Sequence, residues 1–306
     1  MNIYLPIAEL SVNIFGLLAL GGVAGILSGM FGVGGGFLTT PFLIFLGINP
    51  AVAVASSANQ IIASSLSGFF VHWKRKNVDF RMGLFLLIGD LIGSTLGVLI
   101  FRWLKTLGQI DLVISLLYVT LLGSIGAMMA WESYRSLHGT KHTASNSNRT
   151  TFRQLVNLLP WKVRFPHSKL YISAILPISL GFFVGILISI MGIGGGFFMI
   201  PAMIYLLGMP TSIVVGTSLF QIIFTTINVT ILHAISTHTV DIVLAVLLLV
   251  GSTIGAQIGS RTGSRIPAAQ LRGALALMAL AVAVKLVFGL VTPPEELYEV
   301  SVEYTR

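Results

Sequence analysis

A ten-residue pattern occurs twice in this chain. Residues 32–41 read GVGGGFLTTP and residues 192–201 read GIGGGFFMIP. Consecutive glycines give the backbone access to conformations that other residues avoid, and proline favours the first turn of a helix over its interior. Each copy therefore predicts a break in a helix, with Pro41 and Pro201 as helix-break positions.

The similarity between the two halves extends beyond this motif. VASSANQIIAS, from Val54, aligns with VGTSLFQIIFT, from Val215, and Asp79 falls opposite Asp241 after a one-residue insertion. A second set of matched positions is glycine in both halves: Gly89, Gly93 and Gly97 opposite Gly251, Gly255 and Gly259. An internal duplication decides the architecture before any site is considered. We expect two copies of one unit of roughly 120–130 residues each.

The composition places these units in a membrane. Hydrophobic residues make up 55% of the 306 residues and charged residues only 9%, whereas soluble domains carry about a quarter charged residues. Apolar stretches of about 20 residues, the length of a membrane helix, recur along the chain. The predicted fold is an all-α polytopic membrane protein. The absence of cysteine excludes disulfides and thiol chemistry, and the N-terminus, which carries Glu9 and no basic segment, predicts no cleaved signal peptide.

Five apolar segments are expected in each copy. They cover 13–33, 37–47, 50–73, 80–101 and 109–131, then 172–190, 197–208, 211–235, 240–260 and 268–290. The second segment of each copy is too short to cross about 30 Å of hydrocarbon, so it is either a half-span or the returning arm of a re-entrant hairpin. The predicted organisation is a first transmembrane repeat (1–131), a basic cytoplasmic loop with an interfacial segment (132–170), a second repeat (171–291) and an outer acidic tail (292–306).

An odd number of segments per copy predicts that the two repeats have inverted topology. With the N-terminus outside, fourteen Lys and Arg residues fall in inner loops and three in outer loops, which is a strong positive-inside bias. We expect both termini outside and the central loop in the cytoplasm. The net charge of +8 is thereby explained by topology, and no nucleic-acid partner is expected.

Broken helices in two inverted halves point to a substrate site near the middle of the membrane. Unpaired backbone is tolerated there only inside protein or beside water, and the first N–H groups of the following helices favour an anion. The predicted substrate-binding glycines are Gly34, Gly35, Gly36, Gly194, Gly195 and Gly196. Glycines that serve only close helix packing are the alternative.

Polar residues follow each motif. The candidate substrate-binding side chains are Ser57, Asn59 and Gln60 in the first copy, and Ser218 and Gln221 in the second. Hydroxyl and amide groups donate hydrogen bonds to an anion without adding a fixed charge. For the hydroxyls, hydrogen bonding between helices is an equally good explanation. The matched glutamines favour the site.

Three ionisable residues in or near the spans are candidates for coupling or gating. Asp90 lies within the fourth segment of the first copy, opposite Ser252 in the second, and either carries a proton or pairs with a polar neighbour. His72 and His233 lie near the ends of equivalent segments, where a histidine at the membrane interface without a chemical role is the alternative. Neither a metal nor another cofactor is expected.

At these residues the chain resembles the sulfite exporter TauE/SafE family. The resemblance is carried by GVGGGFLTTP, GIGGGFFMIP and the SSANQ and TSLFQ stretches, and it covers nearly all of both halves but not the central loop. It implies a multi-span transporter of the bacterial inner membrane whose substrate is a small anion, often containing sulfur. The three-glycine runs, Gln60 and Gln221 fall on the family's motif positions. One departure is that Asn59 of the first copy corresponds to Phe220 in the second.

The leading hypothesis is secondary transport of a small anion by alternating access between the repeats, with membrane lipid around the protein and protons as a candidate coupling ion. A passive anion pathway and a non-transporting membrane partner protein are the alternatives. An enzyme is not expected, because Asp90 is the only carboxylate within the predicted spans and the two histidines lie toward opposite faces. Oligomeric state is not predicted.

Overall fold

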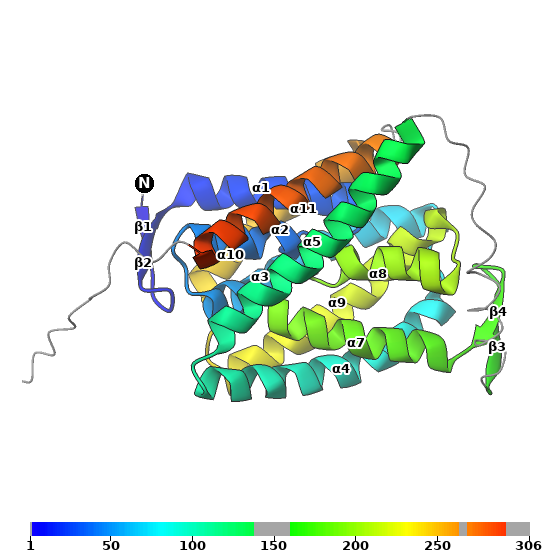
Figure 1. Cartoon of the computed structure of the whole chain (residues 1–306), viewed down its shortest axis with the longest axis horizontal. Helices are drawn as coiled ribbons and strands as arrows, with labels where there is room; N and C mark the ends of the chain where they lie inside the picture. The colour runs from blue at the N-terminus through cyan, green and yellow to red at the C-terminus, as the bar shows by residue number, and fades with distance from the viewer. Residues whose placement is uncertain (1, 138–159, 263–267, 292–306) are drawn as a thin grey trace, which may run out of the picture.

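The computed structural model describes residues 2–137, 160–262 and 268–291, and its two halves contain the same order of elements (Figure 1). The first half comprises β1 (Asn2–Leu5), β2 (Leu10–Asn13), α1 (Ile14–Phe31), α2 (Gly36–Phe45), α3 (Pro50–Lys74), α4 (Phe80–Thr106) and α5 (Ile110–Leu137). The second half comprises β3 (Lys162–Phe165), β4 (Leu170–Ser173), α7 (Ile175–Met191), α8 (Gly196–Ala202), the π-helix η1 (Met203–Leu207), α9 (Thr211–Ser236), α10 (Ile242–Thr262) and α11 (Ala268–Val291). The predicted tail at 292–306 and most of the predicted central loop lie outside the described residues, and the domain boundaries stay predictions.

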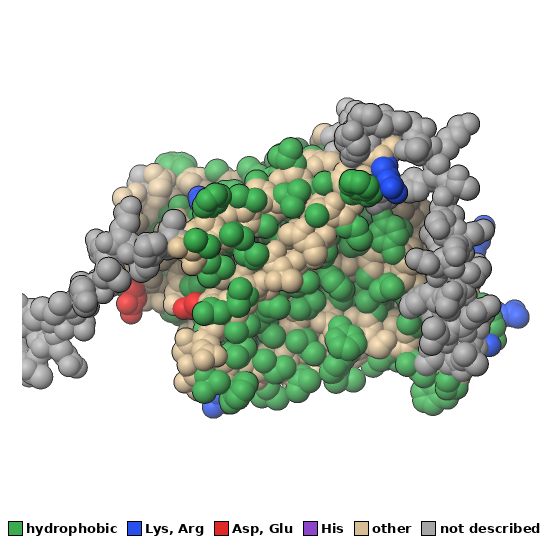
Figure 2. All heavy atoms as spheres, in the orientation of Figure 1, with side chains coloured by type: hydrophobic (Ala, Val, Ile, Leu, Met, Phe, Trp, Pro, Cys, Tyr) green, Lys and Arg blue, Asp and Glu red, His purple; other side chains and the backbone are tan. Residues whose placement is uncertain are grey.

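Six helices of the described chain are long and apolar enough to cross a membrane. They are Ile14–Phe31, Phe80–Thr106, Ile110–Trp131, Thr211–Ser236, Ile242–Thr262 and Gly273–Val291. Large apolar side chains cover the face seen in Figure 2, and the charged side chains visible there lie toward the two ends. The predicted helical, multi-pass membrane fold is thereby confirmed, with two short β-hairpins in addition.

The short second helix of each half is the returning arm of a hairpin. Leu43 and Ile48, at the end of α2, pack in one cluster with Leu5 of β1 and Leu17 of α1, so α2 ends beside the hairpin from which α1 starts. Likewise Met203 and Leu207 of η1 share a buried cluster with Phe165 of β3. The second helix of each half is therefore a returning arm and not a half-span.

The fourth helix of each half packs on the opposite half. α4 lies against α7 and α9, and α10 lies against α1 and α3. The matched glycines make this contact close: a Cβ on Gly93 would be 2.9 Å from the Cα of Phe182 in α7, and one on Gly255 would be 2.9 Å from the backbone nitrogen of Ile26 in α1. The two bundles of the molecule therefore each combine helices from both repeats.

Two short hairpins that the sequence analysis did not predict close the ends of the molecule. Strands β1–β2 and β3–β4 pair antiparallel and lie at opposite ends in Figure 1. Residues 162–165, expected within an interfacial segment, form strand β3. Glu9 and Lys169 occupy matching positions in the two hairpin turns, where their φ angles are 54° and 52°. The matching spacing of these two segments was the sequence signal that could have identified the hairpins. Hairpins at opposite ends are what an inverted repeat would produce, and the inverted topology itself stays a prediction.

Each hairpin is held by an aspartate of the opposite half. Asp241 Oδ2 accepts hydrogen bonds from the backbone N–H groups of Ile7 (2.9 Å) and Ala8 (3.3 Å), while its Oδ1 caps α10. Asp79 Oδ2 accepts from the N–H (3.1 Å) and hydroxyl (2.6 Å) of Ser168, while its Oδ1 caps α4. These two matched contacts fix the first turns of α4 and α10, the helices that pack on the opposite half.

Candidate functional site

The two glycine motifs meet in the interior of the molecule. The rings of Phe37 and Phe197, one residue inside α2 and α8, stack with centroids 5.1 Å apart and planes 15° apart. A Cβ added to Gly196 would lie 2.6 Å from the Cα of Val33 and 2.7 Å from the carbonyl oxygen of Gly32, and a Cβ on Gly36 would collide with the carbonyl oxygen of Gly192. Only glycine lets the two backbones approach this closely.

Both motifs break the helix as the sequence predicts. Each break begins at a left-handed glycine that caps the preceding helix, Gly32 (φ 72°) or Gly192 (φ 66°). Each ends at a second left-handed glycine before the next helix, Gly35 (φ 77°) or Gly195 (φ 72°). The first N–H groups of a helix have no acceptor one turn earlier in that helix, and α2 and α8 begin where the motifs meet. Some of these groups bond locally here: the N–H of Gly196 donates to the carbonyl oxygen of Gly194 (2.8 Å), and that of Leu38 to the carbonyl oxygen of Gly35 (3.2 Å).

The prolines do not mark the breaks, which corrects the expectation for Pro41 and Pro201. Both lie inside the returning helices, five residues after the first helical glycine. Proline at such a position removes a backbone donor from the helix. In the second half α8 ends directly after Pro201, at Ala202, and the chain continues as the π-helix η1.

The serines of the candidate set bind motif carbonyls of the opposite half. Ser57 Oγ donates to the carbonyl oxygen of Gly192 at 3.4 Å, and Ser218 Oγ donates to that of Gly32 at 3.4 Å. Each serine also bonds a carbonyl of its own helix, at 3.0 Å and 2.9 Å. A hydroxyl has one proton, so each serine shares it between its own helix and a motif carbonyl of the opposite half, and the substrate-binding role of both stays a prediction.

Three further hydroxyl groups hold the motifs and were missed by the sequence analysis. Tyr118 on α5 is fully buried and donates to the carbonyl oxygen of Met191 at 2.7 Å. Ser64 Oγ lies 3.2 Å from the carbonyl oxygen of Gly34, and Thr40 Oγ1 lies 2.8 Å from Ser57 Oγ. Polar residues inside apolar helices were the available signal, but their partners are set by the packing.

Gln60 and Gln221 are among the buried polar residues whose side chains have no hydrogen-bond partner in the described chain, together with Ser28 and Ser65. Both side chains have 0% exposure, and neither amide nitrogen nor amide oxygen of either residue has a hydrogen-bond partner among the described residues. The neighbouring Ile61 contacts Gly34 and Gly194, which places this turn of α3 beside both motifs. A primary amide offers two donors and two acceptor positions, and leaving one buried without a partner costs about 1–3 kcal/mol. These amides are suited to bind a polar ligand.

Asn59 and its counterpart Phe220 have different surroundings. Asn59 is half-buried on α3. Phe220 packs edge-on against Phe80 at 5.3 Å and Phe224 at 5.3 Å, and its ring covers Gly83 of α4. The half with Phe220 therefore uses this position for packing.

The three ionisable candidates are separate in the structure. Asp90 is fully buried on α4, where its Oδ2 lies 3.2 Å from Thr225 Oγ1 of α9. His233 is also fully buried: its Nε2 contacts the carbonyl oxygen of Ser189 (3.0 Å) and its Nδ1 contacts Thr237 Oγ1 (3.2 Å). His72 is half-buried in the last turn of α3. His233 is enclosed by α7 and by the T-shaped contact of Phe101, and the choice between a gating role and no chemical role stays a prediction for both histidines.

Among the described residues, no three His, Cys, Asp or Glu side chains are close enough to hold a metal ion.

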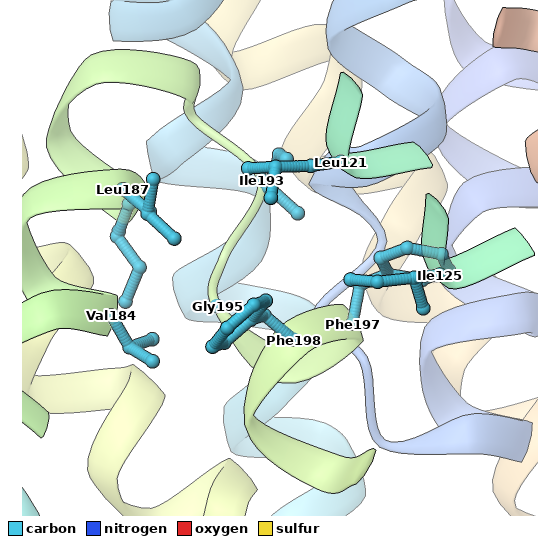
Figure 3. Close-up of a pocket in the computed structure, with 9 residues that line it drawn as sticks. Leu121, Ile125, Val184, Leu187, Ile193, Gly195, Phe197 and Phe198 are labelled. Carbon is cyan, nitrogen blue, oxygen red and sulfur yellow. The ribbon is translucent and has the colours of Figure 1, made fainter. Parts of the chain in front are cut away.

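Two cavities adjoin the second motif. One of about 290 Å³ lies between the ends of α1 and α8 and the start of α9, and it is lined by Gly196, Val33, Tyr205 and Ser212 among others. The other has room for only about 10 Å³ and is wholly apolar, with Leu121, Ile125 and Val184 around Gly195 (Figure 3). The small cavity gives a polar ligand no partner, whereas the larger one extends to Gly196 of the motif; Gln60 and Gln221 line neither cavity.

Comparisons with known proteins agree with this architecture. The family model described as Sulfite exporter TauE/SafE matches residues 17–286. The Bacillus subtilis (strain 168) protein named "Probable membrane transporter protein YjnA" is 30% identical over 239 residues, which cover 77% of this chain and 85% of that protein. The "Probable membrane transporter protein YunE" of the same organism is 28% identical over 234 residues, 72% of this chain and 78% of that protein. A "Probable membrane transporter protein" of Xylella fastidiosa (strain 9a5c) is 29% identical over 218 residues, 68% of this chain and 70% of that protein. No solved structure matches.

Proposed function

The chain belongs to the sulfite exporter TauE/SafE family, and on that premise we propose that it is a secondary transporter that moves a small, sulfur-containing anion across the bacterial inner membrane. Sulfite, a sulfonate or a related sulfur oxyanion is the substrate class. The proposal is supported by two matched, fully buried glutamines whose amides have no partner among the described residues. Each lies on a helix turn next to a residue that reaches a glycine motif, Ile61 after Gln60 and Ser218 before Gln221. No catalytic role is proposed.

Neutral donors suit an anion that must be released again. The amide groups of Gln60 and Gln221 and the first N–H groups of α2 replace part of the water lost by the anion, and the positive end of the α2 dipole favours its charge. Hydrogen bonds to a charged group contribute about 1.5–3 kcal/mol each. A few such bonds provide selectivity without the tight binding that a buried cation would cause.

Alternating access is proposed to occur between the two bundles. One combines α1, α3 and α10, and the other combines α7, α9 and α4. The cavity of about 290 Å³ approaches Gly196 from the side where α9 begins. On another side of the same motif, Tyr118 is buried against the carbonyl oxygen of Met191. We propose that the first side faces the cytoplasm, with both termini outside, and that substrate release follows rearrangement of these contacts.

The test is anion flux in proteoliposomes with Gln60→Leu and Gln221→Leu. Leucine keeps nearly the volume of glutamine but removes the amide, so a purely structural glutamine without partners would be replaced at little cost in stability. We expect both variants to fold as stably as the wild type and to lose at least tenfold in apparent affinity for the anion. The reason is that a lost hydrogen bond to a charged group costs about 1.5–3 kcal/mol, whereas a tenfold change in affinity corresponds to about 1.4 kcal/mol.

The panel comprises thiosulfate, methanesulfonate, sulfite and acetate, and Gln109→Leu in the exposed α4–α5 turn is the control. Saturable flux of a sulfur anion by the wild type and the control, with loss in the two site variants, supports the proposal. The proposal would be refuted if proteoliposomes with the wild-type protein transported none of the sulfur anions. Flux that does not saturate would instead favour the passive pathway, and folded protein without flux would favour the non-transporting partner.

A further inference from the structure

The two halves differ at one position of the fourth helix, which lies next to the helix turn that carries each site glutamine. In the first bundle Ser252 of α10 donates to the carbonyl oxygen of Gln60 at 3.4 Å. In the second bundle the corresponding residue of α4 is Asp90. Asp90 does not bond Gln221 directly, but it contacts Thr225, whose hydroxyl lies 3.0 Å from the backbone carbonyl oxygen of Gln221, one turn earlier in α9. An acid is therefore linked through one hydroxyl to one of the two glutamines.

Asp90 has no counter-ion among the described residues. Asp90 has 0% exposure and its Oδ1 has no described partner, and Gly181 and Gly185 let the backbone of α7 pack directly against the backbone of Asp90. α7 contains no charged residue, and the one titratable residue of α9 is His233, which lies about two turns beyond Thr225 and is bound to Ser189 and Thr237. Charges on α4 itself are confined to its ends (Arg81, Arg102 and Lys105), and on α5 Asp111 and Arg135 lie near the ends of that helix.

A buried carboxylate without a counter-ion is strongly unfavourable, and one hydroxyl contact does not replace its lost hydration, so burial favours the neutral acid in this packing. It becomes ionised only when rearrangement of the bundles brings water to it. Binding and release of a proton are thereby tied to the conformational cycle.

Thr225 has one hydroxyl proton and two acceptors within reach. When Asp90 is protonated, it donates to Thr225 Oγ1, and Thr225 donates to the carbonyl oxygen of Gln221. When Asp90 is ionised, Thr225 must turn its proton to the carboxylate, because a hydroxyl donates only one hydrogen bond. The bond to Gln221 is then lost. The protonation state of Asp90 thus sets the hydrogen bonding of the turn that carries the site amide.

We propose that Asp90 binds a coupling proton, that Thr225 transmits its protonation state to Gln221, and that the anion and the proton move in the same direction. The proposal rests on the proposed function. Symport follows from electrostatics, since an anion bound by Gln221 and an ionised Asp90 about one turn away would repel each other in a medium of low dielectric constant. The step is acid–base chemistry alone: Asp90 takes a proton from water on one side and releases it to water on the other.

The first experiment measures coupling with thiosulfate and methanesulfonate, which remain fully ionised between pH 5 and 8, so any proton that moves is carried by the protein. The variants are Asp90→Asn, which keeps the shape, and Asp90→Ser, which copies Ser252 of the other half. We expect an imposed proton gradient to accelerate wild-type uptake at least tenfold and to alkalinise the acidic compartment. Both variants should still exchange anion for anion, without a response to the gradient.

Gradient-driven uptake that persists in Asp90→Asn would overturn the inference while leaving the proposed function intact. If proteoliposomes with the wild-type protein transported neither anion, the result would count against the proposed function instead. A second experiment then tests the proton site alone. Infrared spectra of purified wild type minus Asp90→Asn should show a protonated carboxyl band at pH 7. Thr225→Val should shift this band, and Thr226→Val, which removes the neighbouring buried hydroxyl, should not. A spectrum without that band would overturn the inference.

Discussion

Phe37 and Phe197 stack ring on ring at 5.1 Å, although 160 positions separate them in the chain. Each is the second residue of a returning helix. The stack therefore places the beginnings of α2 and α8 side by side, which brings two helix N-termini and two glycine breaks to one region. This single contact brings the two repeated sequence motifs to one place in the fold.

The closeness of the two motifs predicts that alanine is not tolerated at Gly196. Its Cβ would lie 2.6 Å from the Cα of Val33, so the loops must separate, and such overpacking costs about 1–3 kcal/mol. We expect Gly196→Ala to lower thermal stability in detergent and to reduce anion flux at least tenfold. The control is Gly123→Ala in α5, where nothing lies within 4 Å of the added Cβ. Flux at the wild-type level in Gly196→Ala would contradict the close approach.

The aspartate contacts predict local, reciprocal effects on the two hairpins. Asp241→Ala removes the acceptor of the Ile7 and Ala8 N–H groups, and Asp79→Ala removes that of the Ser168 N–H. Loss of a charged acceptor costs about 1–3 kcal/mol, so amide exchange measured by mass spectrometry should accelerate about tenfold or more at 2–13 in the first variant and at 162–173 in the second. Each variant is the control for the other. Equal acceleration at both hairpins would argue against separate contacts.

The predicted orientation can be tested directly because the chain has no cysteine. Arg75 and Gln109 are exposed in turns at the two ends of α4. With the basic turn inside, an impermeant thiol reagent applied to intact cells should label Gln109→Cys at once, and Arg75→Cys only after the membrane is opened. The reverse pattern would invert the proposed topology.

The sequence was sufficient for the features that depend on local backbone chemistry. The glycine triplets predicted both helix breaks, and the apolar segments predicted the helices to within a few residues at most ends. The prolines misled, because each short helix continues through its proline beyond the first turn and gives up one backbone donor there. The two hairpins were missed because four-residue strands beside a membrane helix carry little hydrophobic periodicity.

The partners of the polar side chains were decided only by the tertiary structure. Ser57 and Gln60 lie three positions apart on α3, yet one binds a carbonyl oxygen of the opposite motif and the other has no described partner. Nothing in their spacing separates these outcomes. They follow from the packing of α4 and α10 on the opposite halves, which sets the neighbours of each turn. The amino-acid order determined where the helices break, because glycine conformation is local, whereas the groups available to an anion depend on contacts between segments some 160 residues apart.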